Sequence, residues 1–200
     1  MSYPQLVVIF VLAIAAIAPA RAMPVTVEAA MAERSLGKVD AKVTVIEYAS
    51  LTCPHCAAFH RDVLPELKKQ YIDTGKIRYV FRDFPLDGRA AIAAMAARCA
   101  PKERYFPFID ALFKTQEQWA RAEDVHKALS PIARLAGMSQ EGYEACVKNE
   151  ALYQAIRAAR GQAETEFRIE STPSFVVNGK KTELGTTFTS VEKVLRPLLK

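Results

Sequence analysis

Two cysteines separated by two residues form a pair that could exchange electrons with other thiols. The motif is Cys53-Pro54-His55-Cys56, and it lies between an apolar run at 43–48 and a stretch with helical spacing. At the start of a helix the first thiol lies near unpaired backbone N–H groups, which favour a thiolate over a thiol. The second thiol is one turn further on, close enough to close a small disulfide ring. This placement predicts thiol–disulfide exchange.

The two residues between the cysteines fit this chemistry. Pro54 fixes the turn at the first helical position. His55 can place a positive charge beside the Cys53 thiolate, which lowers the thiol pKa and makes the disulfide more oxidising. The alternative is that His55 faces solvent and serves only as a spacer.

A zinc site is the main alternative for two closely spaced cysteines. Zinc usually needs a second, distant pair of Cys or His ligands, whereas Cys99 and Cys146 are widely spaced and lie in helical stretches. Covalent haem attachment needs His directly after the second cysteine, where this chain has Ala57. We therefore expect the chemistry to need no metal and no organic cofactor.

The elements that position the motif follow from the spacing of apolar residues. The run at 43–48 is apolar and β-branched almost throughout, as in a strand buried on both faces, and Glu47 is the exception in it. Its apolar neighbours predict that Glu47 is buried; an exposed position on an edge strand is the alternative. A helix is predicted at 57–74, kinked at Pro65, and an alternating strand follows at 76–84.

Most of the remaining chain is predicted to be helical. Residues 25–34 suit a short strand or an amphipathic turn. Asn178-Gly179 is typical of a hairpin turn, here between short strands at 174–177 and 182–184. The predicted helices cover residues 89–99, 104–115, 124–136, 139–148, 150–167 and 191–199.

The order of these elements predicts an α/β fold. The 200 residues, of which 50% are hydrophobic, allow one domain with an insertion. With the central helical block set aside, the order is β-α-β-α-β-β-α, which builds a small mixed sheet with helices on both faces. We assign residues 23–85 and 150–200 to this sheet domain and residues 86–149 to an inserted all-helical domain.

Residues 1–22 are interpreted as a secretory signal peptide. An uninterrupted apolar run at 6–18 is followed by Ala20-Arg21-Ala22, a small-x-small cleavage pattern. No Lys or Arg precedes the run, so an uncleaved membrane anchor is the alternative, although the run is short for a bilayer span. Export in either form predicts an oxidising compartment.

In such a compartment Cys99 and Cys146 are expected to form a structural disulfide. It would join two helices of the insertion and close a loop of about 47 residues, with a stabilisation of about 3 to 4 kcal/mol. Two buried free thiols are the alternative.

The charge of the chain argues against a nucleic-acid partner. The formal net charge is +5, and Lys and Arg are interleaved with Asp and Glu without a basic block. We assign no role to His60 and His126, which we expect at the surface or at helix caps. Trp119, with Phe106 and Phe108, is expected in the core of the insertion.

The CPHC motif, the element order and Thr172-Pro173 resemble the DsbA-type proteins, bacterial envelope thiol oxidases with a thioredoxin fold. The resemblance covers residues 37–200. It implies an α/β thioredoxin fold with an inserted all-helical domain. In the family the cis-proline, here Pro173, lies against the disulfide and leaves the preceding backbone free to pair with a bound peptide. Thr172 and Pro173 are therefore the implied substrate-binding position.

The resemblance also implies the roles of the other site residues. Cys53 matches the exposed nucleophile, and Cys56 matches the buried resolving cysteine. Glu47, six residues before Cys53, matches the family's buried acid, which moves the proton on and off the resolving thiol. Pro54 and His55 match the pair that tunes the thiolate.

The family implies a monomeric periplasmic protein thiol:disulfide oxidoreductase that donates its Cys53–Cys56 disulfide to reduced or unfolded exported proteins. A DsbB-type quinone-linked membrane oxidase would re-oxidise it. Disulfide isomerase or reductase activity is one alternative, because isomerases typically have Thr before the cis-proline, as at Thr172, whereas the best-known oxidases have Val. Against it, the segment before Val43 is too short for the separate dimerisation domain of the envelope isomerases. A non-catalytic peptide-binding holdase is the other alternative.

Overall fold

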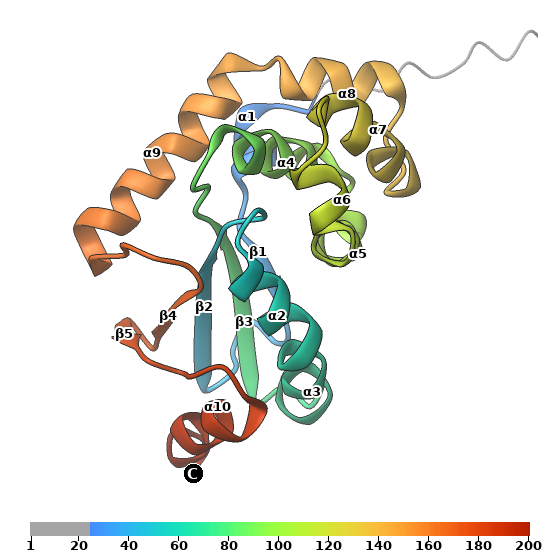
Figure 1. The fold of residues 1–200 in the computed structure, drawn as a ribbon. Coiled ribbons are helices and arrows are strands. Elements are labelled where there is room, and N and C mark those ends of the chain that lie inside the picture. Colours follow the sequence, from blue (N-terminus) through green and yellow to red (C-terminus); the bar gives the residue numbers. More distant parts are fainter. Residues whose placement is uncertain (1–24) are drawn as a thin grey trace, which may run out of the picture.

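The computed structural model describes residues 25–200, which form a mixed five-stranded sheet with helices packed on it (Figure 1). The order across the sheet is β1-β3-β2-β4-β5. The central strands β2 and β3 are parallel, and the other neighbouring pairs are antiparallel. The predicted α/β class is confirmed. The strands are β1 (Arg34–Leu36), β2 (Val43–Ala49), β3 (Ile77–Asp83), β4 (Ser174–Val177) and β5 (Lys180–Thr182).

Helices cover both faces of the central strands, as their apolar sequences require. One cluster of buried side chains joins β2 and β3 to α2, α3 and α10, and a second cluster lies under the end of α9 on the other face. The helices are α1 (Val27–Met31), α2 (Pro54–Asp62), α3 (Leu64–Leu67), α4 (Gly88–Cys99), α5 (Tyr105–Lys114), α6 (Gln116–Ala120), α7 (Val125–Leu135), α8 (Gln140–Val147), α9 (Glu150–Phe167) and α10 (Phe188–Leu195). Shorter helical turns are η1 (Lys68–Ile72), η2 (Lys102–Arg104) and η3 (Arg196–Leu199).

The helix that begins at the cysteine motif is interrupted. It ends at Asp62, and α3 starts at Leu64 with Pro65 in its first turn. Proline has no N–H to donate to the carbonyl four residues earlier, and its ring crowds that turn, so the expected kink becomes a break at Val63. The π-helical turn η1 follows, and the chain turns toward β3 through Gly75, whose φ of 76° favours glycine.

Between β3 and β4 every element is a helix. Figure 1 shows α4 to α8 gathered at one end of the sheet, with α9 running back along it. The predicted core residue Trp119 is fully buried in this part of the chain, and its Nε1 donates a hydrogen bond to the carbonyl oxygen of Leu112 at 2.8 Å. Trp119 belongs to the same cluster of buried side chains as β2, β3 and α2, so the helices between β3 and α9 share one core with the sheet.

The N-terminal segment forms two short elements. Thr26 caps α1 by accepting a hydrogen bond from the N–H of Ala29 at 3.2 Å. The three residues of β1 pair antiparallel with β3, so the sheet has five strands rather than the four of the predicted order. The predicted signal peptide, residues 1–22, lies outside the described residues. Within residues 25–200, no helix is both long and apolar enough to cross a bilayer.

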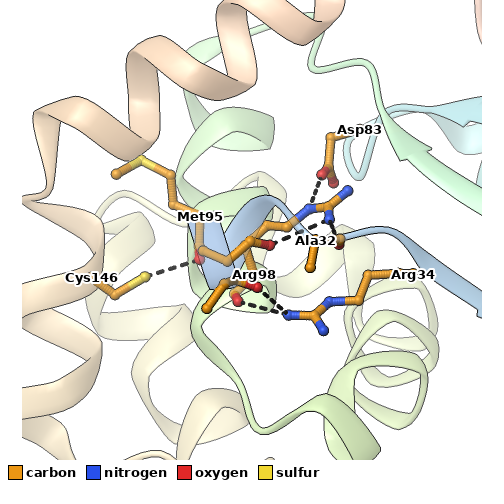
Figure 2. Close-up of polar contacts among 8 residues, drawn as sticks. Ala32, Arg34, Asp83, Met95, Arg98 and Cys146 are labelled. Carbon is orange, nitrogen blue, oxygen red and sulfur yellow. Dashed lines mark hydrogen bonds and ion pairs between the residues drawn. The ribbon is translucent and has the colours of Figure 1, made fainter. Parts of the chain in front are cut away.

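A buried ion pair joins β3 to α4, and hydrogen bonds connect it to the N-terminal segment (Figure 2). The Nε of Arg98 on α4 donates a hydrogen bond to Oδ2 of Asp83 at the end of β3, at 2.5 Å, and the two side chains are 4% and 5% exposed. Nη1 of Arg98 also donates to the carbonyl oxygen of Ala32 at 2.9 Å. Nη2 of Arg34 donates to the carbonyl oxygen of Arg98 at 3.4 Å. These contacts hold α1, β1, β3 and α4 together.

A disulfide lies next to this pair. Cys99, the residue after Arg98, is bonded to Cys146 on α8 across a sequence separation of 47. The Cys146 sulfur lies 2.9 Å from the carbonyl oxygen of Met95 on α4 (Figure 2). A disulfide sulfur carries no proton, so this is a close contact and not a hydrogen bond. The structure thus contains the disulfide that we expected between Cys99 and Cys146.

Candidate active site

The cysteine motif lies at the start of α2. Cys53 is the N-cap residue, and Pro54 is the first residue of the helix. The N–H of Cys53 donates to the carbonyl oxygen of Ser50 at 3.0 Å, and the N–H of Ala57 donates to the carbonyl oxygen of Cys53 at 3.2 Å. Both cysteines are thiols in the structure, and Cys53 is 7% exposed whereas Cys56 is fully buried. An incoming thiol therefore reaches Cys53 first.

The second part of the site is the loop before β4. The Thr172–Pro173 peptide bond is cis. The thiol of Cys53 donates a hydrogen bond to the carbonyl oxygen of Thr172 at 3.2 Å. The hydroxyl oxygen of Thr172 is buried and has no hydrogen-bond partner among the described residues. Three of the residues expected at the site are thus brought together from distant parts of the chain.

The surroundings of Cys53 favour its thiolate. The hydrogen bond from the Cys56 thiol has the largest effect, and burial opposes it. The Thr172 hydroxyl, which has no other partner among the described residues, can donate to the thiolate, and the backbone N–H groups of Cys56 and His55 act in the same direction. The pKa of Cys53 is lowered to about 5. Cys53 is therefore ionised at neutral pH, as an attacking thiol requires.

The surroundings of Cys56 favour its neutral thiol. Burial is the main cause that raises the pKa of Cys56 well above its ordinary value, and the hydrogen bond to Cys53 and the charge of Glu47 raise it further. The two thiols of the motif thus differ in charge at neutral pH. This difference assigns attack to Cys53 and requires a proton to leave Cys56 before it can react.

The side chain of His55 is exposed, as is that of Pro54. Among the described residues, its imidazole forms no hydrogen bond or ion pair. The contribution of this position to the low pKa of Cys53 comes from the backbone N–H of His55. An effect of the imidazole charge on the thiolate stays a prediction.

Glu47 is fully buried in β2. Its Oε2 accepts a hydrogen bond from the hydroxyl of Tyr79 on β3 and lies 3.2 Å from Nε2 of His60. Its Oε1 is buried without a hydrogen-bond partner among the described residues. The charge of this carboxylate acts on Cys56. One oxygen of the carboxylate is therefore held by Tyr79 and His60, and the other has no hydrogen-bond partner among the described residues.

The structure contradicts the expected surface position of His60. This side chain points inward from α2, and its ring packs against those of Phe113 and Phe81, with centroids 4.3 and 5.7 Å away. Its Nδ1 lies 3.8 Å from Oδ1 of Asp110 on α5. Burial opposes a charge on His60, but the charge of Glu47 and the contacts with Asp110 outweigh burial and raise the pKa to about 9. His60 is therefore protonated at neutral pH and places a positive charge beside Glu47.

The helical part of the chain fixes the loop that carries the motif. Gln116 on α6 is buried, and its Nε2 donates to the carbonyl oxygens of Leu51 and Cys53 at 2.8 and 3.0 Å. The hydroxyl of Thr52 donates to Oδ2 of Asp87, the N-cap of α4, at 2.6 Å. We did not predict either contact, because each joins residues far apart in the sequence.

Comparisons with known proteins establish the family. A family model described as Thioredoxin matches residues 29–196. The crystal structure of alpha-DsbA1 from Wolbachia pipientis is similar, with a TM-score of 0.77 and 34% sequence identity, over 84% of this chain and 92% of that chain. This chain belongs to the DsbA-like thioredoxin-fold family. The predicted thioredoxin fold with a helical insertion is confirmed for this DsbA-like chain.

Two further relatives of the DsbA-like chain carry names that describe a reaction. A protein-disulfide oxidoreductase of Rickettsia bellii is 38% identical over 149 residues, 74% of this chain and 58% of that protein. The crystal structure of a protein-disulfide isomerase from Novosphingobium aromaticivorans is 25% identical with a TM-score of 0.72, over 84% of this chain and 98% of that chain. The DsbA-like chain spans between 55% and 65% of the length of the Rickettsia relatives that it matches.

Proposed function

We propose that this chain is a periplasmic protein thiol:disulfide oxidoreductase that donates its Cys53–Cys56 disulfide to reduced cysteines in folding proteins. The observation that carries the proposal is the difference in pKa between the two thiols. The pKa of Cys53 is lowered to about 5, and that of Cys56 is raised. A stable thiolate favours the dithiol form, and this makes the disulfide a stronger oxidant.

The reaction begins when a substrate thiolate attacks the Cys53 sulfur of the oxidised protein. The Cys53–Cys56 bond breaks, Cys56 leaves with the electron pair and takes a proton, and a mixed disulfide joins Cys53 to the substrate. A second substrate thiolate then attacks the substrate sulfur of this mixed disulfide. Cys53 leaves as a thiolate, so the substrate is oxidised and the enzyme gains two electrons.

The other site residues have supporting roles in this proposal. Thr172 and Pro173 form the backbone beside Cys53 on which a substrate peptide lies. Glu47 exchanges the proton of Cys56 through its free oxygen. Pro54 and His55 shape the turn that presents the backbone N–H groups to the thiolate.

Export and re-oxidation complete the proposal. The apolar run and cleavage pattern of residues 1–22 support export to the periplasm. A DsbB-type quinone-linked membrane oxidase would accept the two electrons from the dithiol form and restore the disulfide of the monomeric enzyme. The disulfide between Cys99 and Cys146 supports an oxidising compartment.

A disulfide isomerase is the second candidate. Thr172 before the cis-proline and the likeness to a protein named as a disulfide isomerase favour it. The pKa of about 5 for Cys53 lies between about 7 for thioredoxin and about 3.5 for DsbA. The expected enzyme is therefore an oxidant weaker than DsbA, and its dithiol form could also attack incorrect disulfides.

Two folding assays separate these activities. The oxidised protein is mixed with a reduced, unfolded substrate that needs several disulfides, and the dithiol form is mixed with the same substrate carrying scrambled disulfides. We expect fast disulfide formation in the first assay, abolished in Cys53→Ser, and slower recovery in the second. No acceleration of the first assay would overturn the oxidase. Full activity of Cys53→Ser would indicate a holdase instead.

A further inference from the structure

A group of titratable side chains is buried between the sheet, α2 and α5. Glu47 comes from β2, His60 from α2 and Tyr79 from β3, and none of these side chains is more than 2% exposed. Asp110 from α5 lies at the edge of the group and is 53% exposed. We propose that His60 is a positioning residue for Glu47. It holds this side chain in a fixed orientation beside a positive charge and leaves one carboxylate oxygen free to exchange a proton with Cys56. This inference rests on the proposed function and deepens it.

The two oxygens of Glu47 differ in their hydrogen bonds. Oε2 accepts from the Tyr79 hydroxyl and lies 3.2 Å from Nε2 of His60, which is 3.3 Å from the Tyr79 oxygen. Oε1 has no partner among the described residues, although it is buried. Because both donors converge on one oxygen, the carboxylate keeps a fixed orientation and an unused acceptor.

The positive charge of His60 lies beside the buried carboxyl group of Glu47. A carboxylate buried without a compensating charge takes up a proton, because burial disfavours the charged form. A protonated Glu47 could not accept the proton of Cys56. An imidazolium at 3.2 Å supplies the compensation, and the aromatic rings around it leave Glu47, Tyr79 and Asp110 as the titratable groups that face it.

Asp110 connects the buried group to solvent. Its Oδ1 lies 3.8 Å from Nδ1 of His60, the nitrogen that does not face Glu47. The imidazole therefore lies between a buried carboxylate and a carboxylate that water reaches. Through this contact Asp110 helps to keep the proton on His60, because an opposite charge favours the charged form of its neighbour.

The proposed step conserves atoms and charge. During re-oxidation the Cys56 S–H proton moves to Oε1 of Glu47 as the sulfur bonds to the Cys53 sulfur. The bond between Cys53 and the oxidant breaks, and the oxidant leaves with the electron pair. During disulfide donation the proton returns to the Cys56 thiolate. His60 stays protonated in both directions and touches neither sulfur.

The test uses three variants of the full chain. His60→Gln keeps a polar side chain without the charge, and His60→Lys restores a positive charge. His126→Gln changes an exposed histidine and is the matched control. Stopped-flow mixing of the dithiol protein with oxidised glutathione separates attack by Cys53 from resolution by Cys56, and circular dichroism shows that each variant is folded.

We expect His60→Gln to slow resolution at pH 7 at least tenfold while attack by Cys53 changes less than twofold. In the unaltered protein, a plot of the resolution rate against pH should show an inflection near pH 9 from His60. His60→Gln should lack this inflection. His60→Lys should recover most of the rate, and His126→Gln should behave as the unaltered protein. Equal resolution rates and pH profiles for His60→Gln and the unaltered protein would overturn the inference.

A measurement on the unaltered protein covers the case in which the variants do not fold. The nitrogen chemical shifts of His60 in the dithiol protein are expected to show an imidazolium at pH 7, and a neutral ring would overturn the inference. Failure of the proposed function is distinct, because the unaltered protein would then not oxidise a reduced substrate. An active oxidase with a neutral His60 contradicts only the role given to this histidine.

Discussion

The Cys53 thiol donates a hydrogen bond to the carbonyl oxygen of Thr172 at 3.2 Å, although the two residues are 119 positions apart in the chain. This contact joins the start of α2 to the loop before β4, so that the thiol and the proposed peptide-binding backbone form one site. The carbonyl oxygen accepts a hydrogen bond from the thiol, but it cannot donate one to a thiolate. When Cys53 ionises, the Cys56 thiol, the Thr172 hydroxyl and backbone N–H groups are the donors.

Replacing the Thr172 hydroxyl tests one of these donors. Thr172→Val keeps the carbonyl and the side-chain shape but removes the hydroxyl, so we expect the pKa of Cys53 to rise by about one unit. Thiolate absorbance at 240 nm as a function of pH measures the change. Thr172→Ser keeps the hydroxyl and is the matched control. A pKa that is equal in the Val and Ser variants would show that the hydroxyl does not stabilise the thiolate.

Gln116 should stabilise the loop that carries the motif. Gln116→Leu leaves the carbonyl oxygens of Leu51 and Cys53 without their side-chain donor, and an unsatisfied buried polar group costs about 1 to 3 kcal/mol. We expect the free energy of unfolding to fall by about 2 to 4 kcal/mol in urea titrations. Gln118→Leu, on the exposed side of the same helix, should change it by less than about 0.5 kcal/mol. Equal values for the two variants would contradict the role of Gln116.

The pair between Arg98 and Asp83 should be essential to stability. Arg98→Met leaves a buried carboxylate without its partner, and such a loss costs about 3 to 5 kcal/mol in the free energy of unfolding. Arg121→Met removes an exposed arginine and should cost less than about 1 kcal/mol. The double variant Arg98→Met with Asp83→Asn should recover part of the loss, because no buried charge is left alone. Denaturation of the three variants at pH 7 measures these differences. An Arg98→Met variant with an unchanged free energy of unfolding would contradict the role given to this pair.

The stability of the dithiol form relative to the disulfide form should rise with pH. Cys53 has a folded pKa of about 5, below the unfolded value of about 8.5, so its contribution is lost as pH falls through 5 and grows as pH rises toward 8.5. At pH 7 it is about 3 kcal/mol. His60 has the opposite sign, because its raised pKa of about 9 stabilises the folded state below pH 6.5 and this is lost as pH rises through 9. The His60 contribution occurs in both redox forms and cancels from their difference.

Thermal unfolding of both forms between pH 4 and pH 9 measures this difference. Cys53→Ser is the control. It has a single form without the titrating thiol, and its stability should not show the rise expected for the dithiol form. A difference in stability between the two redox forms that is independent of pH would contradict the low pKa.

The elements around the site could be predicted because each has a strong local pattern. Val43 to Tyr48 is apolar and β-branched, and Cys53 to Cys56 opens a helix, so both have the expected secondary structure. The apolar neighbours of Glu47 also predicted its burial. The edge strand β1 has only three residues, too few to show a period, and its pairing with β3 is a tertiary effect.

The contacts between distant charged or polar residues could not be predicted. His60 was expected at the surface because histidine is usually polar and exposed, yet it lies one helical turn after Cys56 on the buried face of α2. That spacing was the available signal, because Cys56 was already expected to be buried. Nothing in the sequence pairs Arg98 with Asp83, or Gln116 with the motif, since these contacts depend on how the helical part packs on the sheet.

The reduction potential of the Cys53–Cys56 pair tests the central claim most directly. Lowering the pKa of the attacking thiol from about 7, as in thioredoxin, to about 5 stabilises the dithiol form by about 2 kcal/mol at pH 7, which is about 50 mV. Equilibration with glutathione redox buffers should therefore give a value above about −230 mV, between about −270 mV for thioredoxin and about −120 mV for DsbA. A potential at or below that of thioredoxin would contradict the assignment as an oxidase.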